Sequence, residues 1–137
     1  MDNKEILSHV DHTLLKATST WEQIRKICDE AVRNETAAIC IPPAYVKLCQ
    51  DSYPDLKIAT VIGFPLGYNT TAVKVFETKE AIKEGADEID MVINIGWAKD
   101  GLFDKITDEM AEEGRGVTAA SEMAMRDPYA GLLGADM

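Results

Sequence analysis

The chain has 137 residues, of which 46% are hydrophobic and 28% charged, a composition that suits one globular domain. Its formal net charge of -10 argues against binding a nucleic-acid backbone over a broad surface, but allows one small phosphorylated ligand in a local pocket. No apolar run approaches the roughly 18 residues of a membrane span, and the first ten residues lack a secretion signal. With three cysteines and no Cys-x-x-Cys motif, we expect a cytoplasmic protein with free thiols that binds neither membrane nor nucleic acid.

The first half of the chain alternates between short apolar runs and helical patterns. Residues 9–15 predict a short strand or an extended segment. A helix follows, because Thr20 and Gln23 match the capping box, in which each side chain bonds the other residue's backbone amide. Residues 37–41 are a continuous apolar run, typical of a strand covered on both faces. Pro43 fits the first turn of a second helix. The inner side of that helix is assigned to Tyr45, Leu48 and Cys49.

The same alternation continues along the second half. Residues 57–64 are β-branched and apolar and predict a buried strand, and residues 71–84 predict a helix. The core-facing residues of this helix are taken to be Val75, Phe76 and Ile82. Gly85 stands where a helix C-cap with positive φ is wanted. Residues 88–95 predict the next strand, and residues 104–113 the beginning of another helix.

Strands joined by helical crossovers predict a parallel sheet with helices packed on it, so the fold class is α/β. Binding and catalysis in such folds lie at the carboxyl ends of the strands. The βα rhythm stops after four units, whereas a closed eight-stranded barrel takes about 250 residues. Residues 107–137 have only Val117, Leu132 and Leu133 as branched aliphatic residues. We therefore expect a tail that adds no strand and packs poorly beyond a first helix.

Asp90 is the strongest candidate for chemistry. It lies inside an apolar run, and strand alternation places it on one face with Val92 and Asn94. A carboxylate in such surroundings is costly unless it is paired, hydrogen-bonded or protonated, which poises it for proton transfer. The alternative is a structural aspartate bonded to a backbone amide or to a nearby lysine.

Asp11, His12 and Lys16 form a second polar group near the end of the first strand. His9 and His12 are three residues apart and would point to opposite faces of a strand, so we expect no metal site. Asp11 is a candidate partner for a buried lysine. Lys16 is either a functional amine or a solvated cation at the strand end.

Cys40 lies within the apolar run 37–41, where it is either a small core residue or a nucleophile. Neither histidine lies near it in the sequence to activate it. Residues 63–67, Gly-Phe-Pro-Leu-Gly, do not match the Gly-x-x-x-x-Gly-Lys-Ser/Thr motif of a phosphate-binding loop and are better explained as a strand-to-helix turn.

Six segments of the chain form a recognisable set: VDHTLLK (10–16), AICIP (38–42), ATVIGFPLG (59–67), NTT (69–71), FETKEA (76–81) and GADEIDMVINIG (85–96). In this order and spacing they resemble the deoxyribose-phosphate aldolase family. The resemblance covers residues 8 to about 106 and implies a (β/α)8 TIM barrel. Residues 1–106 would carry about four βα units, a half-barrel, and residues 107–137 an atypical tail that forms no separate domain.

The resemblance also implies an activity. The family cleaves 2-deoxy-D-ribose 5-phosphate reversibly to D-glyceraldehyde 3-phosphate and acetaldehyde, through a lysine Schiff base and without a metal or cofactor. Asp90 matches the family's proton-relay aspartate, and Asp11 and Cys40 match residues that line its active site. None of the lysines from Lys16 to Lys105 matches the Schiff-base lysine. We therefore expect the chain alone to be inactive, and expect as partners a phosphorylated sugar and further copies of the chain.

Two other interpretations remain open at this stage. The chain could be a non-catalytic half-barrel that associates with itself or with a partner to bury its open edges. It could also be a small flavodoxin-like binding domain without aldolase chemistry.

Overall fold

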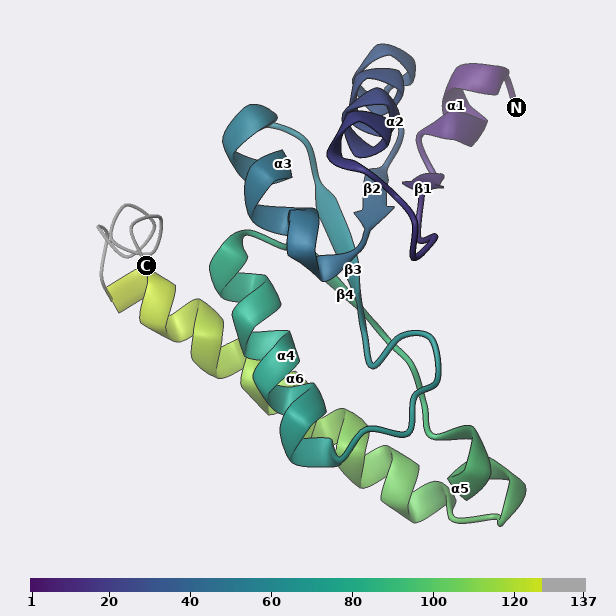
Figure 1. Cartoon of the computed structure of the whole chain (residues 1–137), viewed down its shortest axis with the longest axis vertical. Coiled ribbons are helices and arrows are strands. Elements are labelled where there is room, and N and C mark those ends of the chain that lie inside the picture. The colour runs from purple at the N-terminus through teal and green to yellow at the C-terminus, as the bar shows by residue number, and fades with distance from the viewer. Residues whose placement is uncertain (127–137) are drawn as a thin grey trace. The chain divides into compact units, whose positions relative to one another are not determined.

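The computed structural model of the chain describes residues 1–126, with side chains as far as residue 118. It contains one four-stranded sheet in the order β1-β2-β3-β4, and the β1–β2 and β2–β3 pairs are parallel (Figure 1). A flavodoxin-like sheet reverses its strand order at a switch point, so this sequential order excludes that interpretation. The chain divides into two compact units: residues 1–61 with 85–88, and residues 62–84 with those from 89 onward.

The first unit contains the strands β1, β2 and all but the last residue of β3. The elements in chain order are α1 (Asn3–Leu7), β1 (Asp11–Thr13), α2 (Trp21–Asn34), β2 (Ala38–Ile41), a 3-10 turn (Pro43–Tyr45), α3 (Val46–Ser52) and β3 (Ile58–Ile62). Every residue of β2 and β3 is buried, as their continuous apolar runs predict. In this unit the sequence analysis missed α1, a single short helix that Asp2 caps by accepting a hydrogen bond from the Glu5 amide.

The assignment of Leu48 to the inner side of α3 is wrong, because 44% of this residue is exposed. Val46 and Cys49 are the buried residues of the helix. The turn that precedes α3 is a 3-10 helix, which has 3.0 residues per turn where an α-helix has 3.6. The helix that follows is therefore rotated about its axis, and positions 46 and 49 face inward.

The N-terminus of α2 has the predicted capping box. The Thr20 hydroxyl accepts from the Gln23 amide at 3.3 Å, and the Gln23 side chain accepts from the Thr20 amide at 2.9 Å. We expect Thr20→Ala to lower the free energy of unfolding by about 1 kcal/mol, because one backbone donor of the first helical turn loses its partner. Urea unfolding followed by circular dichroism measures this. Thr18→Ala, at an exposed loop position, is the matched control, and equal stabilities of the two variants would contradict the prediction.

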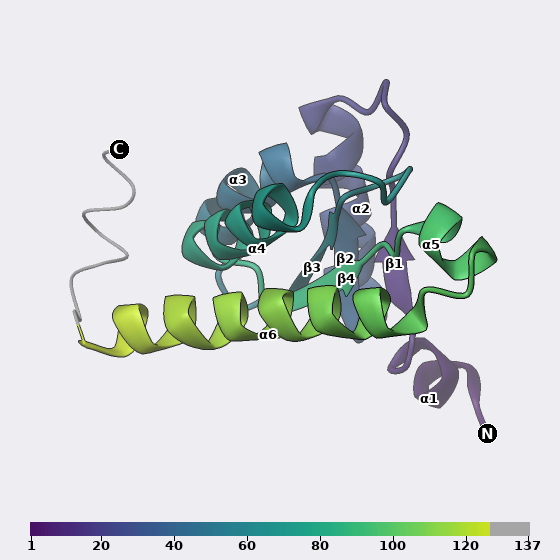
Figure 2. The same cartoon turned by 90° about the horizontal axis from the view of Figure 1, so that it is seen from below.

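The second unit consists mainly of helices. It contains α4 (Thr71–Glu84), α5 (Ile95–Lys99), α6 (Phe103–Arg126) and most of β4 (Glu88–Met91). Figures 1 and 2 both show α6 alongside α4, which is its main packing partner. β4 is shorter than predicted because Asn94 caps α5, its side chain accepting from the Trp97 amide at 3.0 Å. The strand itself ends at Met91, three residues before Asn94.

The inner face of α4 differs from the prediction. Phe76 is 66% exposed, and the buried residues of the helix are Lys74, Thr78 and Ala81. The reason lies on α6, whose buried residues at helical spacing are Ile106, Glu109, Glu113 and Gly116. A polar face of α4 thus packs on a polar face of α6.

The helix expected from residue 104 runs much further, to Arg126, and packs on α4 with buried residues as far as Gly116. It adds no strand within the described residues. The expectation of poor packing beyond this helix concerns residues 127–137, which lie outside the described residues. None of the described helices combines the length and apolar character that crossing a membrane requires.

Candidate functional site

The strand register places Asp11 and Cys40 on one face of the sheet in the first unit. Residues paired across parallel strands share a face, and here Asp11 pairs with Ala38, Thr13 with Cys40, and Cys40 with Ala59. Since side chains alternate along each strand, all five belong to the same face. Asp11 is exposed, whereas Cys40 is 2% exposed and packs with Ala59, Val61 and Leu15.

The opposite face of this sheet packs on α2. His12 points that way, because its Nε2 lies 2.8 Å from Glu30 Oε2 of α2. The hydrogen bond to His12 lowers the pKa of the Glu30 carboxyl. The imidazole is therefore engaged on the helix-covered side, away from the face of Asp11 and Cys40. Lys16 is exposed in the loop after β1.

Asp90 lies in the second unit, in β4, with its neighbours Ile89 and Met91 partly buried. It is exposed, so solvent reaches the carboxylate that the sequence places within an apolar run. The backbone just beyond it is held on both sides. The Val92 amide donates to the Ile62 carbonyl at 3.0 Å, and the Val92 carbonyl accepts from Lys74 Nζ at 2.9 Å.

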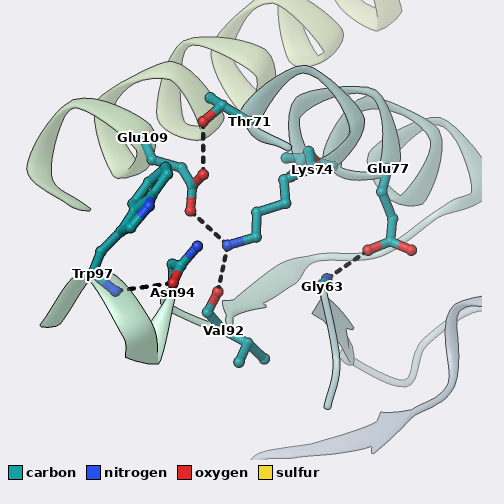
Figure 3. A network of polar contacts seen from close by, with 9 residues as sticks. Gly63, Thr71, Lys74, Glu77, Val92, Asn94, Trp97 and Glu109 are labelled. Atoms are coloured by element: carbon teal, nitrogen blue, oxygen red, sulfur yellow. Dashed lines mark hydrogen bonds and ion pairs between the residues drawn. The ribbon is translucent and has the colours of Figure 1, made fainter. Parts of the chain in front are cut away.

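Lys74 is the centre of a buried polar network that the sequence analysis missed (Figure 3). Its ammonium is fully buried and lies 2.5 Å from Glu109 Oε1, and Glu109 Oε2 accepts from the Thr71 hydroxyl at 2.6 Å. The network joins α4, α6 and the segment after β4. A signal for it does exist in the sequence: Lys74 and Thr78 share a helical face with Ala81, as Glu109 and Glu113 share one with Ile106.

The turn after β3 lies against the same segment. The Gly63 amide donates to Glu77 Oε1 of α4 at 2.7 Å (Figure 3). Gly63 and Gly67 both have positive φ, at +68° and +71°. A Cβ on Gly67 would collide with the Ile93 carbonyl, so only glycine fits this approach of the two loops. Residues 63–67 are thus a strand-to-helix turn, as predicted.

Glu113 adds a second carboxylate to the network. It is 1% exposed, and its Oε2 has no hydrogen-bond partner among the described residues. Burial raises the pKa of Glu113 to about 7; the Lys74 ammonium opposes this rise, and the carboxylates of Glu109 and Glu77 add to it. One cation thus faces more carboxylates than it can neutralise.

The raised pKa of Glu113 makes the free energy of unfolding decrease as the pH rises. Between about pH 4.5 and 7 the folded chain holds a proton on Glu113 that the unfolded chain releases, so stability falls as the pH rises and levels off above 7. We expect Glu113→Gln to remove this decline and to raise the free energy of unfolding at pH 8, by at most about 3 kcal/mol. Urea unfolding at pH 5 and pH 8 measures it. Glu112→Gln, on the exposed side of α6, should keep the decline; a Glu113→Gln variant that also keeps it would contradict the assignment.

Comparison with known proteins places these features in a family. A family profile described as DeoC/LacD family aldolase matches residues 5–122. The chain is 57% identical over 110 residues to the deoxyribose-phosphate aldolase of Clostridioides difficile (strain 630), and 54% identical over 111 residues to that of Clostridium botulinum (strain Alaska E43 / Type E3). Each match covers 80% of this chain and 50% of the relative. The chain thus spans about half the length of the curated relatives it matches.

The fold agrees with this match. The solved structure of QR15, an aldolase, superposes with a TM-score of 0.79 at 32% identity, over 83% of this chain and 52% of that one. The parallel sheet and its helices therefore define an aldolase-type partial (β/α)8 barrel. The chain belongs to the DeoC/LacD aldolase family. The family match extends to residue 122, beyond residue 106 where the sequence resemblance was taken to end.

Proposed function

We propose that this chain supplies the β1–β4 part of a deoxyribose-phosphate aldolase site, in which Asp90 relays protons and Asp11 and Cys40 line the substrate pocket. One observation carries the proposal: the 54–57% identity to curated deoxyribose-phosphate aldolases. The shared sheet face of Asp11 and Cys40 and the solvent-exposed carboxylate of Asp90 support it.

In this proposal the substrate is 2-deoxy-D-ribose 5-phosphate, cleaved reversibly to D-glyceraldehyde 3-phosphate and acetaldehyde. The nucleophile is a lysine contributed by the half of the family's length that this chain does not span. Asp90 moves protons between water, the carbinolamine and the enamine carbon, a role that needs a carboxylate in contact with solvent.

The lysines of this chain are poor substitutes for that nucleophile. A Schiff-base lysine needs a neutral amine, obtained by desolvation or by a neighbouring cation. Lys74 is the one lysine that is buried among residues 1–118, and its amine is held in an ion pair with the Glu109 carboxylate rather than beside a second cation. Lys16 is exposed and solvated.

We expect the 137-residue chain to show no cleavage of deoxyribose 5-phosphate above the buffer rate. Mixed with the carboxyl-terminal half of the Clostridioides difficile relative, it should regain turnover, because the two parts together carry the relay and the lysine. Acetaldehyde release measures both reactions, and borohydride reduction traps the Schiff base. Cleavage by the chain alone would make Lys16→Met the first variant to test. A mixture that associates but neither turns over nor traps would favour the non-catalytic half-barrel.

A further inference from the structure

The first unit holds a pair of thiols that the proposed aldolase chemistry does not use. Cys28 of α2 and Cys49 of α3 are both fully buried, and their Sγ atoms are 3.5 Å apart in hydrogen-bond contact. Both thiols are free. We propose that Cys28 and Cys49 form a modification site, in which a peroxide converts the pair to a reversible disulfide that joins α2 to α3.

The two thiols have unequal roles. The hydrogen bond between the two thiols lowers the pKa of Cys28, whereas the same bond and burial raise the pKa of Cys49. Since the thiolate is the nucleophile, Cys28 reacts first and Cys49 resolves the product. Hydrogen peroxide is close to water in size, so a small local opening of the short helix α3 is enough to admit it.

The reaction balances with hydrogen peroxide as the only oxidant. The Cys28 sulfur attacks one peroxide oxygen and becomes a sulfenic acid, and the O–O bond breaks to release one water. The Cys49 sulfur then attacks the sulfenic sulfur, forming the S–S bond and releasing a second water. The two thiols together lose two hydrogens and two electrons, which the peroxide takes up.

The third cysteine is excluded from this pair by the sheet. Cys40 shares its face with Ala59 and Thr13, which is the face opposite to the side that α2 covers. Cys28 approaches from α2 and therefore from the other side. Oxidation would nevertheless affect β2, because the closed loop from Cys28 to Cys49 contains that strand, and the cross-link would restrict the unfolded chain.

Tryptic mapping of the whole chain tests the proposal, because trypsin places the three cysteines in three peptides, residues 27–33, 34–47 and 48–57. After treatment of the folded chain with hydrogen peroxide, we expect peptide 27–33 linked to peptide 48–57, with the loss of two hydrogens. A thiol reductant should separate them. The urea midpoint of the oxidised chain should be higher than that of the reduced chain.

Two variants sharpen the result. Cys40→Ser keeps the pair and should give the same cross-link, and Cys49→Ala should give none, with Cys28 stopping at sulfenic acid or going on to sulfinic acid. The proposal is overturned if the folded parent chain keeps both thiols reduced, oxidises each without a cross-link, or links either of them to peptide 34–47. This readout needs only the parent chain, so it stands even if Cys49→Ala does not fold.

Discussion

Lys74→Met is expected to lower the free energy of unfolding of the second unit by about 3–5 kcal/mol at pH 7, because it leaves Glu109 buried without its cation. It also removes the donor to the Val92 carbonyl, which holds the chain just after β4. Urea unfolding followed by helical circular dichroism measures the loss. The deficit should shrink towards pH 5, because Lys74 counteracts the raised pKa of Glu113 and the variant loses this help only where Glu113 is ionised.

Lys83→Met is the matched control, since it removes an exposed lysine from the same helix. It should change stability by less than about 0.5 kcal/mol. The double variant Lys74→Met with Glu109→Gln should recover part of the loss, because no unpaired charge then remains at that position. Equal stabilities of Lys74→Met and Lys83→Met would show that the ion pair contributes nothing to the α4–α6 packing.

The second large effect concerns the proposed proton relay. In a full-length relative such as the Clostridioides difficile aldolase, asparagine in place of the aspartate that matches Asp90 is expected to lower kcat by about 10²–10⁴-fold. Asparagine keeps the size and hydrogen-bonding shape of the side chain but cannot exchange a proton. Acetaldehyde release from deoxyribose 5-phosphate, followed across pH, gives the rate and its pH dependence.

The fold must remain intact for this result to bear on the relay. The variant should unfold at the same temperature as its parent and should still form the borohydride-trapped Schiff base, because lysine addition precedes the proton transfers assigned to the aspartate. Unchanged turnover would reduce Asp90 to a structural residue. Loss of both turnover and thermal stability would show that this aspartate supports the fold, and the lost turnover would then not identify a proton relay.

Much of the fold could be predicted because its signals are local. The capping box at Thr20 and the apolar runs of β2 and β3 are set by neighbouring residues, and so is the C-cap at Gly85, whose φ of +115° the sequence anticipated. Helical crossovers between apolar strands allow few arrangements other than a parallel sheet. The candidates Asp11 and Cys40 also came from the sequence, and the register of neighbouring strands placed them on one face.

What the tertiary structure alone decided are the contacts between residues distant in the chain. Hydrophobic periodicity places Phe76 in the core, yet α4 buries Lys74, because a carboxylate 35 residues later in the chain lies against it. The contact of Cys28 with Cys49 likewise depends on how α2 and α3 pack. A one-dimensional pattern records which residues are apolar, but a buried charge is stable only beside its partner, and that partner is determined by packing in three dimensions.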